Sequence, residues 1–561
     1  MPIQNCSILP MLPDFSRSLS RILHAPWWML AIVAGVLTGL AVPGYHLQLL
    51  GLISLLPLLV LLDQDHEHSW KKRWLRSVMA CWIVGTLVSL VGCPWIIHSS
   101  SVFGHLPIPL ALLVGAGYGL EITLILWLEL ALPVLLIRKK GTSELLLRLF
   151  WFLMLEPAHP GLFHWSYGGL TFDGIPWISQ LADLIGAPGL GLYVMGGHLW
   201  LIGWFRQAQS PTKLYPLKQA FGILLVLWFG GLTYGVLREQ QLASIFPESG
   251  KSVRMISLQP NFTLQQLASN PALAYSTRNR NLSDLFSDSI RALDSLDERR
   301  SEVPVLLVWP ESTYPAAFLK NESMRDKVEQ FARLHHVFIL LTSVDWEQDE
   351  TDQLRFWGSA FLINPDGTLN GRYDKIFLIP FGEYLPLADW FPFYARWLRE
   401  NVENMSEFEA GHEPKVFELS ESMRISAPIC FDVFFPEILR DMVRNGADGA
   451  VVLSNLAWFG KTNASRLMEM AVRWNAIENR VPLTLSSNNG PSFVIGAEGK
   501  FQTSRTEWFT QDYLIHTLSL QRHDSFYRDH ALLVRGLWVC LWIGVLLFRR
   551  FEPHPSEASS F

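Results

Sequence analysis

The feature of this sequence that most limits its possible folds is the uneven placement of apolar residues. From residue 1 to about residue 240, the 561-residue chain is a succession of apolar runs, and a last run occupies 531–548. The segment between has the mixed composition of a water-exposed domain. Only 17% of all residues are charged, against about 25% in soluble domains. We therefore expect a membrane domain, a separate folded domain and a final membrane helix.

A helix needs about 20 apolar residues to cross a bilayer. By this measure the sequence predicts an α-helical membrane bundle of about eight spans. The fifth span is the weakest, because Glu156, Pro157 and His159 interrupt it. The expected spans are 26–43, 47–62, 77–97, 107–137, 145–163, 178–204, 217–236 and 531–548.

The basic residues indicate which side of the membrane each loop occupies. Lys and Arg cluster in alternate loops, whereas loops 98–106 and 164–177 contain neither. The positive-inside rule then places both termini in the cytoplasm and the folded domain outside. The expected division is a membrane domain of about seven spans, an extracytoplasmic domain, and a C-terminal transmembrane helix with a short cytoplasmic tail. These parts correspond to residues 1–240, 241–529 and 530–561.

Four carboxylates lie within or beside the apolar runs: Glu121, Glu129, Glu156 and Asp183. A charged side chain at the bilayer centre costs roughly 2.5–3.5 kcal/mol on insertion scales, so each needs an explanation. A functional role and a structural hydrogen-bonding role both stay open for Glu156. For the other three we expect hydrogen bonds between helices or contact with a polar groove.

The segment 241–529 carries short aliphatic runs that end in turns, with amphipathic stretches between some of them. This pattern predicts a mixed α/β sheet covered by helices, with ligands bound beyond the strand ends. The expected strands are Arg254–Leu258, Val303–Trp309, Val337–Thr342, Ser359–Ile363, Arg424–Ile429, Gly449–Leu453, Pro482–Ser486 and Ser492–Ile495. The expected helices are Met324–Leu334, Pro436–Asn445 and Ser465–Ile477.

Cys430 is the one cysteine in the 241–529 segment. A thiol needs a nearby base or positive charge to be a good nucleophile at neutral pH. Glu311, at the end of an expected strand, could accept its proton, and Lys375 could stabilise the thiolate and a tetrahedral oxyanion. Spacing alone does not bring the three together. Taken singly, a strand-end Glu more often caps a turn, and a Lys beside an Asp more often forms a surface ion pair.

Several short motifs resemble those of one enzyme family. WPES, YDK and PICFD are similar to the Glu, Lys and Cys motifs of the nitrilase superfamily. PFGEYLP, AWFG and NNG, together with the membrane layout, narrow the resemblance to the apolipoprotein N-acyltransferases. The motifs lie at 309–312, 373–375, 428–432, 380–386, 457–460 and 488–490, respectively.

The resemblance implies a nitrilase-like αββα sandwich and a two-step (ping-pong) acyl transfer. Cys430 would take an acyl chain from a membrane phospholipid and pass it to the N-terminal amine of a diacylglyceryl apolipoprotein. Glu311 would act as base and then acid, Lys375 as oxyanion stabiliser, and Glu383 would orient Lys375 or assist the base. The resemblance also implies a monomer in the bacterial inner membrane with a periplasmic catalytic domain. No cofactor, metal or nucleic acid is expected, and the net charge of −6 gives no basic surface for nucleic acid.

The sequence departs from the family pattern near the expected site. Phe431 and Asp432 stand where Tyr-Glu is usual after the nucleophile. Leu456 replaces an Asp, and Arg466 and Leu467 stand where a Gln-His pair often occurs. We include Phe431 and Asp432 among the supporting site residues. These differences bear on the acyl donor, the acceptor or the rate rather than on the reaction class.

Two other functions share these features. A membrane-tethered nitrilase-like amidase would use the same residues on a small carboxamide, but so many spans exceed what an anchor needs. A diverged, non-catalytic lipid-binding homologue would explain the departures, but Glu311, Lys375 and Cys430 are all present. The aromatic stretch at 390–397 predicts a mobile arm that dips into the bilayer surface, where aromatic side chains are favoured.

Overall fold

The protein is described here from a computed structural model. His159, Tyr394 and Trp397, named in the predictions above, lie outside the described residues. The structure describes residues 25–64, 68–102, 104–137, 140–158, 161, 164, 166–209, 216–245, 251–263, 271–296, 303–314, 317–350, 352–388, 390–393, 396 and 407–549.

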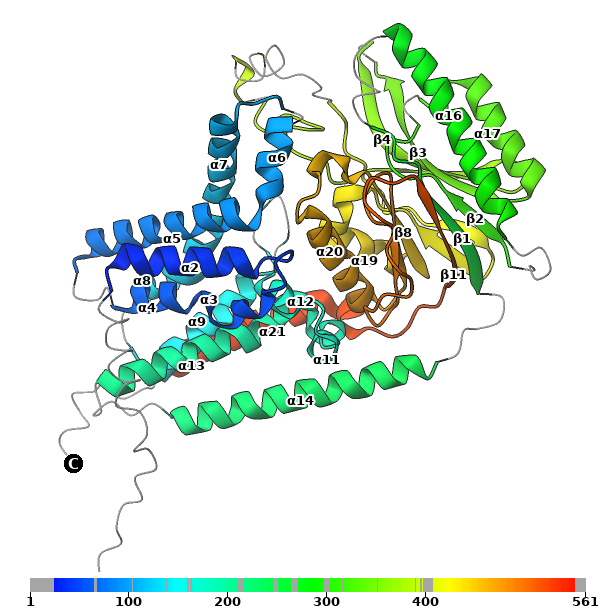
Figure 1. Cartoon of the computed structure of the whole chain (residues 1–561). Coiled ribbons are helices and arrows are strands. Elements are labelled where there is room, and N and C mark those ends of the chain that lie inside the picture. The colour runs from blue at the N-terminus through cyan, green and yellow to red at the C-terminus, as the bar shows by residue number, and fades with distance from the viewer. Residues whose placement is uncertain are drawn as a thin grey trace, which may run out of the picture.

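Two β-sheets form the centre of the C-terminal half of the chain (Figure 1). The strands are β1 Ser252–Gln259, β2 Val305–Val308, β3 Phe338–Gln348, β4 Leu354–Ile363, β5 Leu369–Asp374, β6 Phe417–Ser420, β7 Met423–Ser426, β8 Gly449–Ser454, β9 Leu483–Ser487, β10 Phe493–Ile495 and β11 Asp512–Ser519. One sheet has the order β11-β1-β2-β3-β4-β5, and the other has the order β10-β9-β8-β7-β6. Both sheets mix parallel and antiparallel pairs, as the sequence predicts.

Helices cover the outer face of each sheet. They are α16 Pro271–Asp294, α17 Glu322–His335, α19 Pro436–Arg444 and α20 Ala464–Asn479. Side chains alternate along a strand, so Leu306 and Leu340 share a core with the second sheet, while Leu307 and Leu341 pack toward α16 and α17. Figure 1 shows α19 and α20 on the opposite side. The order helix, sheet, sheet, helix confirms the αββα sandwich.

All expected strands and helices of this domain correspond to observed elements. The analysis of the sequence missed α16 and the strands β5, β6 and β11. Each of the three missed strands lies at the edge of its sheet. An edge strand buries less surface than a central one, so it carries fewer apolar residues and a weaker strand pattern. The central strand β8 is buried throughout and was the clearest to recognise.

The N-terminal half and the last described helix form a helical body beside the sandwich (Figure 1). Among the described residues, α5 Trp70–Gly92, the continuous stretch Ile108–Leu136, α14 Leu217–Ala243 and α21 Phe526–Phe548 are long and apolar enough to cross a membrane. The bent pair α12 Ala182–Gly189 and α13 Gly191–Gln209 makes a possible fifth span, with an angle of 55°. The count of about eight spans is therefore not confirmed.

The other expected spans are helical but short or broken. Helix α2, Trp27–Ala41, has 15 residues and is about 22 Å long, less than the roughly 30 Å of a bilayer's hydrocarbon core. Helix α9, Thr142–Leu155, ends just before Glu156 and Pro157. The expected second span is broken into η1 Gln48–Leu50, α3 Gly51–Ser54 and α4 Leu56–Gln64. The remaining elements of this body are α6 Pro94–Val102, α7 Ile108–Leu126, η3 Trp127–Ala131, α8 Leu132–Leu136, α10 Tyr167–Phe172 and α11 Pro176–Ser179.

Two of the carboxylates in the apolar runs have structural partners. The Glu156 carboxylate accepts the backbone N–H groups of Tyr167 and Gly168, at the start of α10. Asp183 accepts hydrogen bonds from the Tyr234 hydroxyl at 2.7 Å and from the guanidinium of Arg238 at 2.9 Å. These contacts confirm the structural role expected for Asp183 and favour the same role for Glu156.

Buried polar contacts dock the sandwich on the helical body. Arg480, at the end of α20, is fully buried and lies 2.8 Å from Asp183. The same guanidinium donates to the side-chain oxygen of Gln180 at 2.7 Å. Arg473 forms an ion pair with Asp173. Because α20 both covers a sheet and carries or adjoins these contacts, this helix is a main link between the two parts.

We predict that Arg480→Met destabilises the protein strongly. The substitution removes one of the two guanidinium groups that pair with the buried Asp183 and leaves the side-chain oxygen of Gln180 without this donor, which should cost about 2–3 kcal/mol. The exposed ion pair of Arg355 with Asp349 gives the matched control, because Arg355→Met should cost less than about 1 kcal/mol. The midpoints of thermal unfolding in detergent measure both effects. Equal shifts for the two variants would contradict the docking role of Arg480.

Candidate active site

The candidate residues all follow strands that point to the same region of the sandwich. Glu311 comes after β2 and Lys375 directly after β5 in the first sheet. These two strands run in the same direction, because β4 is antiparallel to both β3 and β5, and β3 is parallel to β2. In the second sheet, Cys430 follows β7 and Asn455 follows β8, which are parallel. Ligands of such sheets bind beyond the carboxyl ends of the strands.

The structure brings the expected charged groups into contact. Lys375 Nζ lies 2.6 Å from Glu383 Oε1 and 3.5 Å from Glu311 Oε1. The other oxygen of Glu311 accepts the backbone N–H of Asn455 at 2.8 Å. The other oxygen of Glu383 accepts the N–H of Ile379 at 2.9 Å. Both carboxylates are therefore fixed on one side by the backbone and on the other by the ammonium group.

Cys430 lies against this cluster and is almost fully buried. The Ser454 hydroxyl donates to its Sγ at 3.6 Å, and the charges of the Glu311 carboxylate and the Lys375 ammonium both act on the pKa of the thiol. The backbone of Cys430 has φ of 49°, in the left-handed region that residues with a Cβ rarely adopt. This turn leads from the strand into the short helix η5 Cys430–Phe434. Strained residues of this kind persist where the surrounding structure fixes them, often at functional sites.

Burial and charge set the protonation of the cluster. Burial raises the pKa of the Glu311 carboxyl, and the nearby Lys375 only partly offsets this effect. Burial also raises the pKa of the Cys430 thiol, so the thiol keeps its proton at rest. Burial alone would lower the pKa of Lys375, but the carboxylates of Glu383 and Glu311 more than reverse this, and Lys375 stays charged. Moving the thiol proton to Glu311 leaves the net charge of the buried site unchanged.

Asp432 connects the nucleophile turn to the loop that carries Lys375. One oxygen accepts the N–H of Phe377 at 2.8 Å. The other accepts the Tyr373 hydroxyl at 2.7 Å and the N–H of Ile429 at 2.9 Å. Burial raises the pKa of Asp432 to about 6. Asp432, which is shorter than the usual Glu, therefore has a structural role. It fixes the turn at Cys430 relative to the loop that carries Lys375.

Three of the other departures from the family pattern, Phe431, Leu456 and Leu467, are buried and apolar, whereas Arg466 is partly exposed and forms an ion pair with Glu469. Phe431 packs against Phe434, with ring centroids 5.3 Å apart. Leu456 occupies space that Gly490 leaves free, since a Cβ on Gly490 would lie 2.6 Å from the Leu456 side chain. Leu467 is also buried. Phe431, Leu456 and Leu467 therefore belong to the apolar surroundings of the site, and none of these departures replaces a charged group of the site.

The analysis of the sequence missed three residues that contact the candidate site. Ser454 and Asn455 touch Cys430 and Glu311, and Tyr373 holds Asp432. The signal for Ser454 and Asn455 was present, because they follow an expected strand directly, as Glu311 does. The partnership of Tyr373 with Asp432 joins two segments whose spacing along the chain gives no indication of contact.

Comparison with known proteins identifies the family. Residues 34–200 match the apolipoprotein N-acyltransferase N-terminal domain, and residues 290–528 match the carbon-nitrogen hydrolase family. An apolipoprotein N-acyltransferase of Geobacter metallireducens is 28% identical over 557 residues, which cover 97% of this chain and 98% of the relative. One of Bdellovibrio bacteriovorus is 27% identical and covers 84% of each chain.

The chain belongs to the apolipoprotein N-acyltransferase family. As a member it is a bacterial membrane enzyme that combines a helical N-terminal domain with a nitrilase-like domain. A crystal structure of Saccharomyces cerevisiae Nit3, of the nitrilase superfamily, is 17% identical and covers 48% of this chain and 90% of its own, with a TM-score of 0.35. Within the part of the acyltransferase that the structure describes, no group of three or more His, Cys, Asp or Glu side chains could hold a metal ion.

We predict an acid limb in the pH dependence of the acyltransferase. Glu311 must be ionised to accept the thiol proton, and burial raises its pKa above the ordinary 4.5. The rate of thioester formation should therefore fall as the pH drops through a value above 4.5, and not at the lower pH typical of an exposed carboxyl. Stopped-time mass spectrometry of the acyl-enzyme between about pH 4 and 8 measures this limb. Asp432→Asn should keep it, because the limb belongs to Glu311; its disappearance would contradict the assignment.

We also predict that Asp432→Asn slows thioester formation by up to about 100-fold, because misplacing reacting groups by an ångström can cost that much. The NH₂ group of the new amide donates a hydrogen bond where a carboxylate oxygen accepted one. One of the three groups that donate to Asp432 therefore loses its acceptor. Tyr373→Phe removes one bond only and should have a smaller effect. The kcat values of both variants, measured with a phospholipid donor, check the order. Equal rates in Asp432→Asn and the native enzyme would contradict a positioning role.

Proposed function

We propose that this enzyme transfers an acyl chain from a membrane phospholipid, through a thioester on Cys430, to the N-terminal α-amine of diacylglyceryl-cysteine lipoproteins. The observation that carries the proposal is a buried cluster: Lys375 lies 3.5 Å from Glu311, and the almost fully buried Cys430 thiol accepts the hydroxyl of Ser454, next to Asn455, which holds Glu311. The names of the full-length relatives support the substrates. The catalytic domain would face the periplasm from the bacterial inner membrane.

In the first step Glu311 takes the thiol proton as Sγ attacks the carbonyl carbon of the phospholipid ester. The positive charge of Lys375 stabilises the tetrahedral oxyanion, which is the main electrostatic contribution in such reactions. The intermediate collapses, the ester C–O bond breaks, and the protonated Glu311 gives its proton to the departing lysophospholipid oxygen. The enzyme then holds a neutral thioester. Glu383 orients Lys375 throughout, as their 2.6 Å contact indicates.

In the second step the lipoprotein amine attacks the thioester carbon. Glu311 accepts the amine proton, and Lys375 again stabilises the oxyanion. The C–S bond breaks, the amide forms, and the thiolate of Cys430 recovers a proton from Glu311. The burial of Cys430 keeps water away from the thioester, which favours transfer to the amine over hydrolysis.

The two alternative functions fit the structure less well. An amidase anchored by its spans would not need a helical domain that matches the N-terminal domain of lipoprotein acyltransferases. A non-catalytic homologue would not need a buried thiol, carboxylate and ammonium in one cluster, since buried charges are costly when they serve no purpose. Both observations favour the acyltransferase.

The test replaces Cys430 with Ala in a cell that depends on this protein for lipoprotein N-acylation. The variant should form no triacylated lipoprotein, while its level in the membrane stays close to that of the native enzyme, because the substitution removes one buried sulfur. Mass spectrometry of a lipoprotein N-terminus measures the product. Undiminished triacylation would refute the proposal, and release of free fatty acid without transfer to an amine would favour a hydrolase.

A further inference from the structure

Three arginine side chains converge on one carboxylate, that of Glu469 on α20. Arg473 Nη2 and Arg505 Nη2 each lie 2.8 Å from Glu469 Oε1. Arg466 Nη1 lies 2.8 Å from Glu469 Oε2. Arg473 also pairs with Asp173 of the helical body. In this arginine cluster three positive charges face two negative ones, so one positive charge is not neutralised within it.

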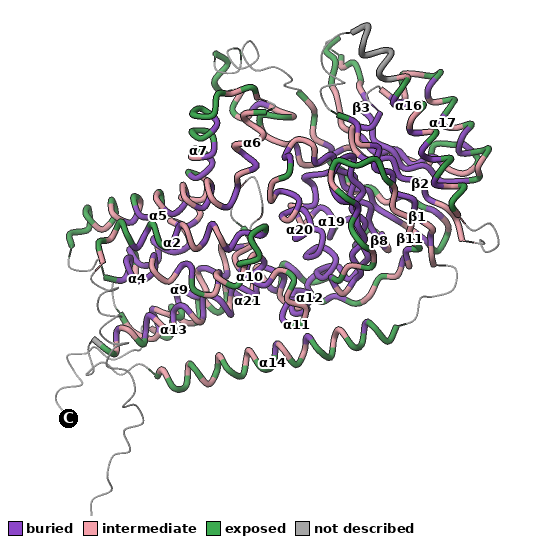
Figure 2. Tube along the Cα trace, viewed as in Figure 1, coloured by how far each residue is buried: buried purple, intermediate pink, exposed green. Residues whose placement is uncertain are grey.

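Two of the three arginines are accessible. The side chains of Arg466 and Arg505 are 34% and 35% exposed, whereas that of Arg473 is 8% exposed. Helix α20 is otherwise buried (Figure 2), and Arg466 is the one residue in it that is not. The contact with Glu469 engages only part of each guanidinium group, which carries several N–H donors. The unneutralised charge of the cluster therefore reaches the surface at Arg466 and Arg505.

The two accessible guanidinium groups are oriented and repel each other. Arg505 lies over the ring of Phe501, 4.3 Å from its centroid, and stacking of this kind fixes the plane of a guanidinium group. Burial lowers the pKa of Arg505, and the positive charges of Arg466 and Arg473 lower it further. The Glu469 carboxylate offsets these effects only in part. An anion bound between Arg466 and Arg505 would relieve the repulsion.

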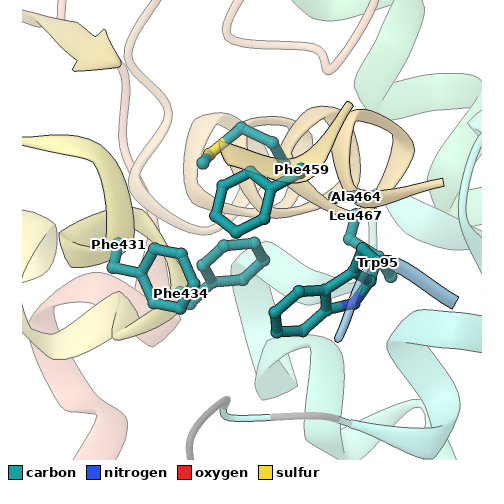
Figure 3. Close-up of a pocket in the computed structure, with 7 residues that line it drawn as sticks. Trp95, Phe431, Phe434, Phe459, Ala464 and Leu467 are labelled. Atoms are coloured by element: carbon teal, nitrogen blue, oxygen red, sulfur yellow. The ribbon is translucent and has the colours of Figure 1, made fainter. Parts of the chain in front are cut away.

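The cluster lies beside the nucleophile turn. Phe431, which directly follows Cys430, and Leu467 line one small apolar hollow (Figure 3). Arg466 directly precedes Leu467, so the first turn of α20 adjoins the turn that carries the thiol. Asp173, in the loop after α10, joins the cluster from the helical body, and the distribution of basic residues predicts that this loop lies outside the membrane. The arginines therefore lie where the headgroup of a lipid would be when its ester reaches Cys430.

We propose that Arg466 and Arg505 bind the phosphate of the phospholipid from which Cys430 takes its acyl chain. The inference rests on the proposed function, because it requires a phospholipid donor. A phosphodiester carries a single negative charge, which would neutralise the cluster, and planar guanidinium groups bind phosphate oxygens through paired hydrogen bonds. Only the glycerol unit separates the phosphate from the acyl esters, so the two groups must bind at neighbouring places. Arg466 stands where Gln often occurs in the family, so this contact is a feature of this chain.

The phosphate site acts in the first step alone. The donor carries a phosphate, whereas the diacylglyceryl-cysteine of the acceptor carries none. Arg466 and Arg505 should therefore increase the rate at which the thioester forms from phospholipid and leave its transfer to the amine unchanged. A purely structural role of the cluster would affect both steps alike.

The experiment compares two palmitoyl donors on the full-length enzyme in detergent micelles. Dipalmitoyl phosphatidylethanolamine has a phosphate, p-nitrophenyl palmitate has none, and both leave the same thioester on Cys430. Arg466→Gln and Arg505→Gln should each lower the ratio of kcat/KM for the first donor to that for the second about tenfold, since each loses a charge-assisted hydrogen bond. Arg466→Lys keeps the charge but not the paired geometry and should lower the ratio about threefold. Intact-protein mass spectrometry measures the thioester.

Arg355→Gln is the matched control, because Arg355, on β4, is also a partly exposed arginine paired with a carboxylate, that of Asp349. Its donor ratio should equal that of the native enzyme. In every variant the rate with p-nitrophenyl palmitate, and the transfer of the thioester to a diacylated lipopeptide, should stay within about twofold of the native values. Retained activity with this donor shows that the variant is folded.

Inorganic phosphate distinguishes a lipid headgroup from a free anion as the ligand. At constant ionic strength it should compete with phosphatidylethanolamine in the native enzyme and leave the reaction with p-nitrophenyl palmitate unchanged. If it instead changes the rates with both donors in the native enzyme but not in Arg466→Gln, the site binds a free anion and its assignment to the donor is wrong.

The outcomes also separate the phosphate site from the proposed function. An unchanged donor ratio in Arg466→Gln and Arg505→Gln would overturn the phosphate site and leave the Cys430 chemistry intact. A native enzyme that forms no thioester with either donor would overturn the proposed function and the phosphate site with it. A ratio that falls in these variants but not in Arg355→Gln supports the phosphate site.

Discussion

The buried ammonium group of Lys375 is the constraint around which the site is arranged. A buried charge without partners costs several kcal/mol, so this side chain requires carboxylates close to it. They come from two different segments, as Glu383 and Glu311. Glu311 in turn is held by the backbone N–H of Asn455, which follows strand β8 of the second sheet. One buried cation therefore links the ends of both sheets, and the sheets cannot shift without breaking these contacts.

The extent of burial explains which parts of the molecule could be predicted from the sequence. Central strands such as β8 are buried on both faces and therefore occur in the sequence as continuous apolar runs. The edge strands β5, β6 and β11 lack such runs. The helical segments were recognisable, and among the described residues four of the expected spans are long and apolar enough to cross a membrane; the breaks that shorten the others were not recognisable. Breaks inside apolar runs, as at Gly186 with its φ of 74°, follow from packing in three dimensions. The charged residues of the site followed from strand ends and motifs, while the contact between Tyr373 and Asp432 depended on folding.

The position of the site relative to the helical body depends on α20. This helix covers the second sheet and, just beyond its end, places Arg480 against Asp183 of the helical body. Its N-terminal end is tied to the same body through Asn463 and the carbonyl of Gly92. With both ends attached, the helix holds the nucleophile turn next to α6. A site so placed is suited to substrates whose chains lie in a bilayer and whose reacting groups lie at its surface.

Asp432 shows how this chain can depart from its family and keep the chemistry. Both of its oxygens are occupied, one by the N–H of Phe377 and the other by Tyr373 and the N–H of Ile429. A carboxylate used in this way supports the turn and has no free position from which to exchange protons with a substrate. In the mechanism proposed above, proton transfer is therefore left to Glu311, whose charge acts on the thiol.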